Sequence, residues 1–201
     1  MPQNPVVRLI GAVALLLAVV AALLVYTPLG RQLWQGENAG DGGAALIGGP
    51  FHLTDQNGQA RTDADFRGQI LLVFFGYSNC PYTCPTTLQT ITTAMDKLGP
   101  DAAKVTPIFI TVDPDRDTPK VLKAYAANFT SRLVALSGSA DEIAAAAKVY
   151  RIYYKKVGEG ADYSMDHTAL VYVMGPDGHY LAHFSTEATA DDIVKDLRQR
   201  F

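Results

Sequence analysis

The sequence predicts an α/β domain whose sheet has mixed strand directions, preceded by a single transmembrane helix. Three observations predict it: an uncharged apolar run near the amino terminus, two continuous apolar runs typical of buried strands, and apolar residues at helical spacing. The 201 residues are 48% hydrophobic and 18% charged, which is enough apolar material for one globular core. The formal net charge of −3 shows no basic excess, so we expect no nucleic-acid partner.

The amino-terminal region reads as a membrane anchor and a tether. Residues 1–8 form the expected cytoplasmic N-terminus, 9–28 the transmembrane anchor, 29–49 a flexible Gly- and Ala-rich tether, and 50–201 the globular domain. Arg8 precedes the apolar run with no acidic residue beside it, which favours an amino terminus in the cytoplasm and an exported domain. A cleaved signal peptide is the alternative. Because no Arg- and Ser-rich leader precedes the run, we expect a single-pass protein of the bacterial inner membrane with its domain in the periplasm.

The first half of the domain reads as a hairpin followed by a strand–helix–strand–helix unit. Residues 51–61 contain an Asn57-Gly58 pair, the turn signal of a short hairpin. Continuous apolar runs predict buried strands at 70–75 and 105–112. Between them, a helix is predicted by one apolar stripe: Leu88, Ile91, Met95 and Leu98. Thr118-Pro119 opens the next helix, whose expected inward-facing residues are Val121, Leu122, Tyr125 and Phe129.

The second half adds a helix, a hairpin and a last helix. A short strand is expected at 133–136, and the Ser139–Glu142 capping box introduces an Ala-rich helix. Further strands are predicted at 151–157, 168–174 and 179–184, the last two joined by a Gly-Pro-Asp-Gly turn. Thr189 caps a final amphipathic helix. This order of elements is that of a thioredoxin-like fold with an N-terminal hairpin extension and a helical insertion.

The two cysteines of the chain form a Cys-x₃-Cys motif, Cys80-Pro-Tyr-Thr-Cys84, between a predicted buried strand and a helix. Reactive groups in open α/β sheets lie outside the carboxyl ends of strands. Pro85 suits a first helical turn, which places Cys84 at the positive end of the helix and favours its thiolate. A structural disulfide is the alternative, but it would close a loop of few residues and add little stability. Two thiolates suit Cu(I), whereas two cysteines are too few for a four-thiolate zinc site.

Four histidines could supply a third ligand: His52, His167, His179 and His183. Of these, His167 is the best candidate. His167 precedes the predicted strand 168–174, so we expect it on a loop at the same end of the sheet as the cysteines. His179 and His183 read as residues of a sheet face, and His52 as a pairing residue of the first hairpin.

Three motifs in order resemble the Sco/SenC family: Phe75–Leu88, Thr111–Pro119 and Asp166–Ala169. Members of this family are membrane-tethered, thioredoxin-like copper chaperones that help to assemble cytochrome c oxidase. The resemblance covers the domain from about residue 50 to the C-terminus, together with the anchor. It implies that one copper ion, Cu(I) or Cu(II), binds to three residues: Cys80, Cys84 and His167.

The resemblance also implies partners and secondary residues. The expected partners are the copper-site subunit of cytochrome c oxidase and another periplasmic copper carrier or a thioredoxin-like reductant. The acidic loop with Asp113 and Asp117 is expected to assist copper transfer or partner contact, and a solvated turn that caps the next helix is the alternative. We further expect Asp166 to orient His167 through its second ring nitrogen.

Two other functions compete with a binding and assembly factor that lacks enzymatic turnover. A thiol–disulfide oxidoreductase would use Cys80 and Cys84 as a redox pair that reduces the cysteines of the oxidase copper site or of a copper carrier. A peroxidase is suggested by the Cys84-Pro-Thr-Thr stretch. The peroxiredoxin pattern, however, has Thr three residues and Pro seven residues before the reactive cysteine, where this chain has Pro81 and Tyr77.

Overall fold

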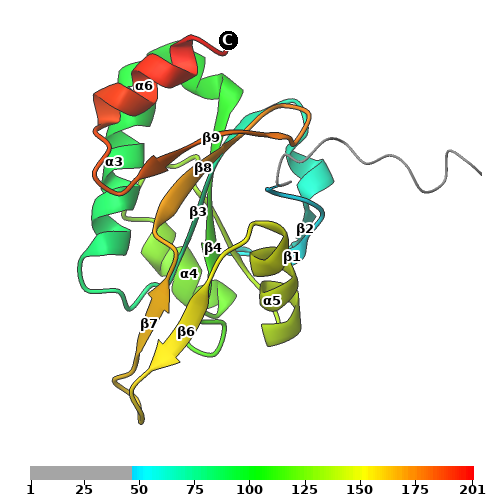
Figure 1. The fold of residues 1–201 in the computed structure, drawn as a ribbon, viewed down its shortest axis with the longest axis vertical. Helices are drawn as coiled ribbons and strands as arrows, with labels where there is room; N and C mark the ends of the chain where they lie inside the picture. The colour runs from blue at the N-terminus through cyan, green and yellow to red at the C-terminus, as the bar shows by residue number, and fades with distance from the viewer. Residues whose placement is uncertain (1–46) are drawn as a thin grey trace, which may run out of the picture. The chain divides into compact units, whose positions relative to one another are not determined.

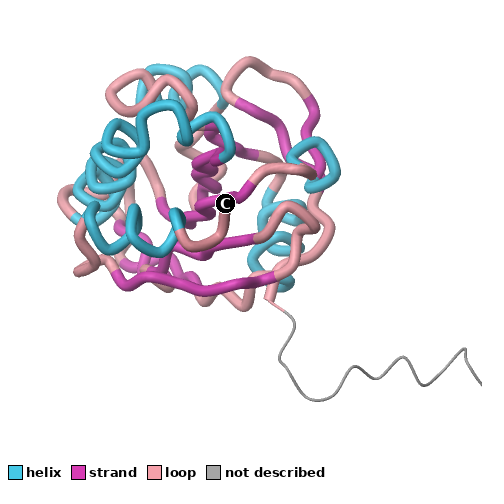
Figure 2. Tube along the Cα trace, turned by 90° about the horizontal axis from the view of Figure 1, so that it is seen from above, coloured by secondary structure: helices cyan, strands magenta, loops and turns pink. Residues whose placement is uncertain are grey.

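The computed structural model describes residues 47–201, which form a mixed seven-stranded sheet with helices on both sides (Figures 1 and 2). The strand order is β2-β1-β5-β4-β3-β8-β9, with β3, β4 and β5 parallel and the other pairs antiparallel. The strands of this sheet are β1 (His52–Asp55), β2 (Ala60–Thr62), β3 (Ile70–Gly76), β4 (Val105–Thr111), β5 (Val134–Ser137), β8 (Leu170–Met174) and β9 (Tyr180–Ser185). A separate two-stranded sheet is formed by β6 (Tyr154–Val157) and β7 (Ser164–His167).

The centre of the sheet explains the apolar runs of the sequence. All seven residues of β3 are buried, and β3 pairs in parallel with β4 so that Phe74 lies opposite Phe109. A strand covered by helices on both faces needs apolar side chains at every position. The two predicted buried strands are therefore confirmed, as is the first hairpin, whose β1 joins the sheet beside β5.

Four helices and two 3₁₀ turns complete the described region: α3 (Thr83–Leu98), α4 (Pro119–Ala126), α5 (Ala140–Val149), α6 (Ala190–Arg198), η1 (Asp63–Phe66) and η2 (Gly99–Lys104). The predicted caps are present. Thr118 accepts a hydrogen bond from Val121 N, and Ser139 and Thr189 each form a capping box. Helices α3 and α6 lie side by side (Figure 1), joined by the 2.8 Å ion pair of Lys97 and Asp191.

Three details differ from the sequence prediction. Val121 is 39% exposed, because the buried stripe of the short helix α4 runs through Leu122 and Ala126. The strand expected from residue 151 begins at Tyr154, because Arg151 has φ of +56° and the chain turns there. Strand β7 was not predicted, so the inserted segment contains a hairpin as well as a helix.

The predicted membrane anchor lies outside the described residues. The predicted segments 1–8 and 9–28 and most of the tether 29–49 belong to the part of the chain that the structure does not describe. Among residues 47–201, no helix has the length and apolar character needed to cross a membrane.

Candidate metal centre

The cysteine loop connects the end of β3 with the start of α3. Cys80 is half-buried in the loop, and Cys84 is fully buried in the first turn of the helix. Cys84 N donates a hydrogen bond to Cys80 Sγ at 3.5 Å, and both cysteines are free thiols. Gly76 makes this packing possible, because a Cβ there would lie 2.8 Å from Cys84 Sγ. A glycine at the end of β3 therefore lets the helix bring its cysteine onto the strand.

The two thiols differ in acidity. A hydrogen bond from the Cys84 thiol, backbone N–H groups of Cys84 and Tyr82 and the nearby His167 outweigh burial and lower the pKa of Cys80 to about 5. The hydrogen bond to Cys80 and burial raise the pKa of Cys84 far above its ordinary value. Our expectation that the helix end favours a Cys84 thiolate is wrong. The N–H group at the start of the helix points to Cys80 instead, and it is the pKa of Cys80 that is lowered.

His167 reaches the cysteines from the second sheet. It ends β7, where a loop was expected, and its Nε2 lies 3.6 Å from Cys84 Sγ. Two ligands of one ion, with bonds of about 2.0 Å to nitrogen and 2.3 Å to sulfur, are separated by roughly 3.5–3.8 Å. The ring is held edge-on by Tyr77 and Phe74, with centroid distances of 6.0 and 6.1 Å. The spacing thus suits a shared metal ion.

The orienting partner of His167 is the backbone and not Asp166. Nδ1 of His167 lies 3.0 Å from Thr168 O, and a carbonyl oxygen only accepts, so Nδ1 carries the proton and Nε2 is free to bind a metal in the neutral ring. Asp166 is exposed, because successive side chains of β7 point to opposite faces. The predicted positioning role of Asp166 is therefore wrong.

A cavity of about 300 Å³ opens beside these groups. It is lined by residues of the segments 77–83 and 165–169, including Cys80, His167 and the 79% exposed Tyr82. Within residues 47–201, no group of three or more His, Cys, Asp or Glu side chains is already arranged to hold a metal ion. A site with all three predicted ligands therefore requires an adjustment of their side chains.

Asp117 holds the cysteine loop through hydrogen bonds. It is fully buried and accepts hydrogen bonds from Ser78 N at 3.0 Å, from the Ser78 hydroxyl, and from Thr111 Oγ1 at 2.6 Å. Thr111 ends β4 and Ser78 follows β3, so one carboxylate joins the ends of two neighbouring strands. Asp117 does not line the cavity; it holds the loop, and its negative charge adds to the raised pKa of Cys84.

Asp113 supports the hairpin that carries His167. Its carboxylate accepts a 2.6 Å hydrogen bond from the Tyr163 hydroxyl and pairs with the Arg116 guanidinium. Arg116 Nη1 donates to Tyr163 O at 2.9 Å, and its guanidinium lies 3.5 Å from the centre of the Tyr163 ring. The buried Arg116 Nη2 has no hydrogen-bond partner and is covered by this aromatic contact.

The sequence reasoning missed three residues of this region: Tyr77, Arg116 and Tyr163. Tyr77 lies inside the cysteine motif and contacts His167, and the i, i+3 spacing of Asp113 and Arg116 was a signal of their ion pair. Tyr163 gave no local signal, because its partner lies 50 residues away.

The remaining histidines stay away from the cysteines. His183 lies on β9 and shares a 2.6 Å hydrogen bond with the Tyr180 hydroxyl. His52 is exposed on β1, and His179 lies at the turn before β9. None of the three lines the cavity.

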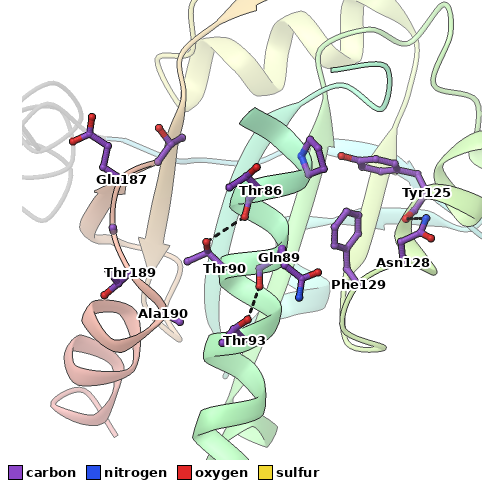
Figure 3. A pocket seen from close by; sticks show the side chains of 13 residues that line it. Thr86, Gln89, Thr90, Thr93, Tyr125, Asn128, Phe129, Glu187, Thr189 and Ala190 are labelled. Atoms are coloured by element: carbon purple, nitrogen blue, oxygen red, sulfur yellow. Dashed lines mark hydrogen bonds between the residues drawn. The ribbon is translucent and has the colours of Figure 1, made fainter. Parts of the chain in front are cut away.

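A larger groove of about 840 Å³ lies along α3 (Figure 3). Tyr125 and Phe129 form one wall and residues 186–190 another. The Thr90 and Thr93 hydroxyls in it donate to carbonyls of their own helix. The hydroxyl of Tyr125 is buried and lacks a hydrogen-bond partner among the described residues.

The fold and the site define a thioredoxin-like domain with a dithiol and a histidine at one end of its sheet. The SCO1/SenC family model matches residues 39–201. The chain belongs to the SCO1/SenC family.

Solved structures and curated relatives agree with this assignment. ScoI of Bradyrhizobium japonicum, solved with copper bound, is 47% identical, with a TM-score of 0.73 over 77% of this chain and 99% of that one. BsSco, described as a member of the Sco family of cytochrome c oxidase assembly proteins with a disulfide switch, is 31% identical, with a TM-score of 0.64 over 77% and 94% of the two chains. The human mitochondrial SCO1 homolog is 38% identical over 162 residues, which are 77% of this chain and 53% of the relative. The chain thus spans about half the length of that relative.

Proposed function

We propose that this protein is a copper metallochaperone that binds one copper ion through Cys80, Cys84 and His167. It delivers copper to the binuclear copper site of cytochrome c oxidase or matures that site. The observation that carries the proposal is the 3.6 Å approach of His167 Nε2, at the end of β7, to Cys84 Sγ, in the first turn of α3. The copper-bound state of the related B. japonicum ScoI supports the choice of metal.

The donor set favours copper on chemical grounds. Two thiolates and an imidazole are soft ligands that Cu(I) accepts at low coordination number and that also bind Cu(II), whereas a structural zinc site takes four ligands. Cys80, with a pKa of about 5, is ready to bind at neutral pH. Cys84 has a raised pKa and must release its proton to become a ligand, so copper binding tightens as the pH rises.

Copper titration of the reduced protein tests the proposal. We expect one tightly bound copper per chain, lost in Cys80→Ser and Cys84→Ser and weakened in His167→Ala with a changed Cu(II) spectrum. His183→Ala is the matched control, because His183 lies outside the cavity, and it should bind as the wild type does. Tight binding that survives in either cysteine variant would refute the assigned site.

A thiol–disulfide oxidoreductase is the second candidate. The free dithiol and the low pKa of Cys80 favour it, because a thiolate is the attacking species in disulfide exchange. Its substrates would be the cysteines of the oxidase copper site or of another periplasmic copper carrier, with a thioredoxin-like reductant restoring the dithiol. His167→Ala separates the candidates. Full reductase activity in this variant, together with weak copper binding in the wild type, would favour the oxidoreductase.

We further propose that residues 9–28 anchor the protein in the bacterial inner membrane with the domain in the periplasm. The support is the uncharged apolar run preceded by Arg8. Removal of the residues before Gly36 should leave a soluble domain that still binds copper. Insolubility or loss of copper binding after this truncation would contradict a purely tethering role.

A further inference from the structure

A methionine occupies the wall of the cavity that holds Cys80 and His167. Met165 lies two residues before His167 in β7, and side chains two apart in a strand share a face. It is 9% exposed, and it lines the 300 Å³ cavity. Its neighbours Ser164 and Asp166 are exposed. The strand that supplies the imidazole therefore supplies a thioether to the same cavity.

The backbone of Met165 is held in the β6–β7 hairpin. It pairs with Lys156 across this hairpin, and Tyr77 of the cysteine loop lines the same cavity. Tyr163, two residues earlier on the same face, is fixed by Asp113. A methionine side chain has three rotatable bonds, so a fixed backbone still lets the sulfur reach different positions in the cavity.

We propose that Met165 supplies its thioether sulfur as a fourth, weaker ligand of the copper ion; this inference rests on the proposed function. Two thiolates and one imidazole leave room for a further donor, and a long axial thioether is a known complement of thiolate and imidazole in copper sites. Asp166 also lines the cavity, but its side chain is exposed and its carboxylate is a hard donor. Soft Cu(I) prefers the thioether, so Met165 holds the reduced ion more strongly than the oxidised one.

The test uses the full chain in mild detergent, with selenomethionine in place of methionine and loaded with Cu(I). Selenium-edge X-ray absorption should show a copper neighbour in the wild type and none in Met165→Leu. Met174→Leu is the matched control, because Met174 is also buried, on β8, and does not line the cavity. It should retain the copper neighbour.

The affinity of the sulfur-containing protein gives a second readout. We expect Met165→Leu to weaken Cu(I) binding about tenfold, at the low end of what the loss of a supporting group costs a metal site. With Cu(II) binding unchanged, the reduction potential of the bound copper would fall by about 59 mV. Met174→Leu should change neither value.

Each remaining outcome overturns a distinct statement. If the loaded wild type shows no copper beside selenium, Met165 is only a wall of the cavity, and this holds whether or not the variant folds. If the wild type binds no copper, the proposed function fails and the inference fails with it. If copper binds but Cu(I) affinity is the same in wild type and Met165→Leu, the fourth ligand is refuted while the chaperone proposal stands.

Discussion

Substitution of Tyr163 by phenylalanine tests whether Asp113 holds the hairpin that carries His167. The variant removes one hydroxyl and leaves the ring, which keeps its contact with the Arg116 guanidinium. The lost interaction is the 2.6 Å hydrogen bond to Asp113 Oδ1, between side chains that are 7% and 3% exposed. The second carboxylate oxygen keeps its pairing with Arg116.

A hydrogen bond to a charged group contributes about 1.5–3 kcal/mol, and a buried oxygen left without a donor places the loss in the upper part of this range. We therefore expect the free energy of unfolding to fall by about 2–3 kcal/mol. For a domain of this size, the melting temperature should fall by about 4–12 °C. Urea unfolding followed by circular dichroism measures the change.

Tyr153→Phe is the matched control for this experiment. Its side chain lies just before the same hairpin and is 61% exposed, so the unfolding free energy should stay within about 0.5 kcal/mol of the wild type. Equal stability of Tyr163→Phe and Tyr153→Phe would refute the reasoning. The ion pair with Arg116 alone would then hold the Asp113 carboxylate.

Three further predictions follow from the same region. The rate of Cys80 alkylation by iodoacetamide, read by peptide mass spectrometry, should be nearly constant from pH 6.5 to 8.5 and fall below about pH 5. The reason is that the thiolate is the reacting species and the pKa of Cys80 is lowered to about 5. A rate that keeps rising up to pH 8.5 would contradict this. Tyr125→Phe removes a buried hydroxyl without a partner and should raise the free energy of unfolding by up to about 1 kcal/mol; a loss of 1 kcal/mol in urea unfolding would reveal a hydrogen bond that we have missed. Gly76→Ala places a Cβ 2.8 Å from Cys84 Sγ and 2.9 Å from the Phe109 ring, so it should destabilise the domain by about 1–3 kcal/mol. An unchanged melting temperature would show that the neighbouring side chains move aside at no cost in stability.

Local patterns were enough to predict the frame of the site. The apolar run of β3 and the capping residues Thr118 and Ser139 each act within a few positions, and the structure confirms the corresponding strand and helices. The placement of Cys84 at the start of α3 followed from Pro85 in the same way.

Properties that depend on distant partners were beyond such patterns. Strand β7 contains only four residues and pairs with another strand of four, so it has too little length to show a period. The sequence predicts a lowered pKa for Cys84, but the N–H group of Cys84 points at Cys80 and the pKa of Cys80 is the lowered one, which only the folded loop shows. The contacts of Asp113 and Asp117 cross 50 and 39 residues of sequence.

The contact between Cys84 and His167 spans 83 residues of chain and joins the first turn of α3 to the end of β7 in the separate two-stranded sheet. An ion bound to both residues would act as a reversible cross-link, so the free energy of metal binding would add to the free energy of folding. At a free ion concentration about 100 times the dissociation constant, this linkage is worth about 2.7 kcal/mol. A carrier that gives up its ion would thereby also loosen the hairpin that helped to hold it.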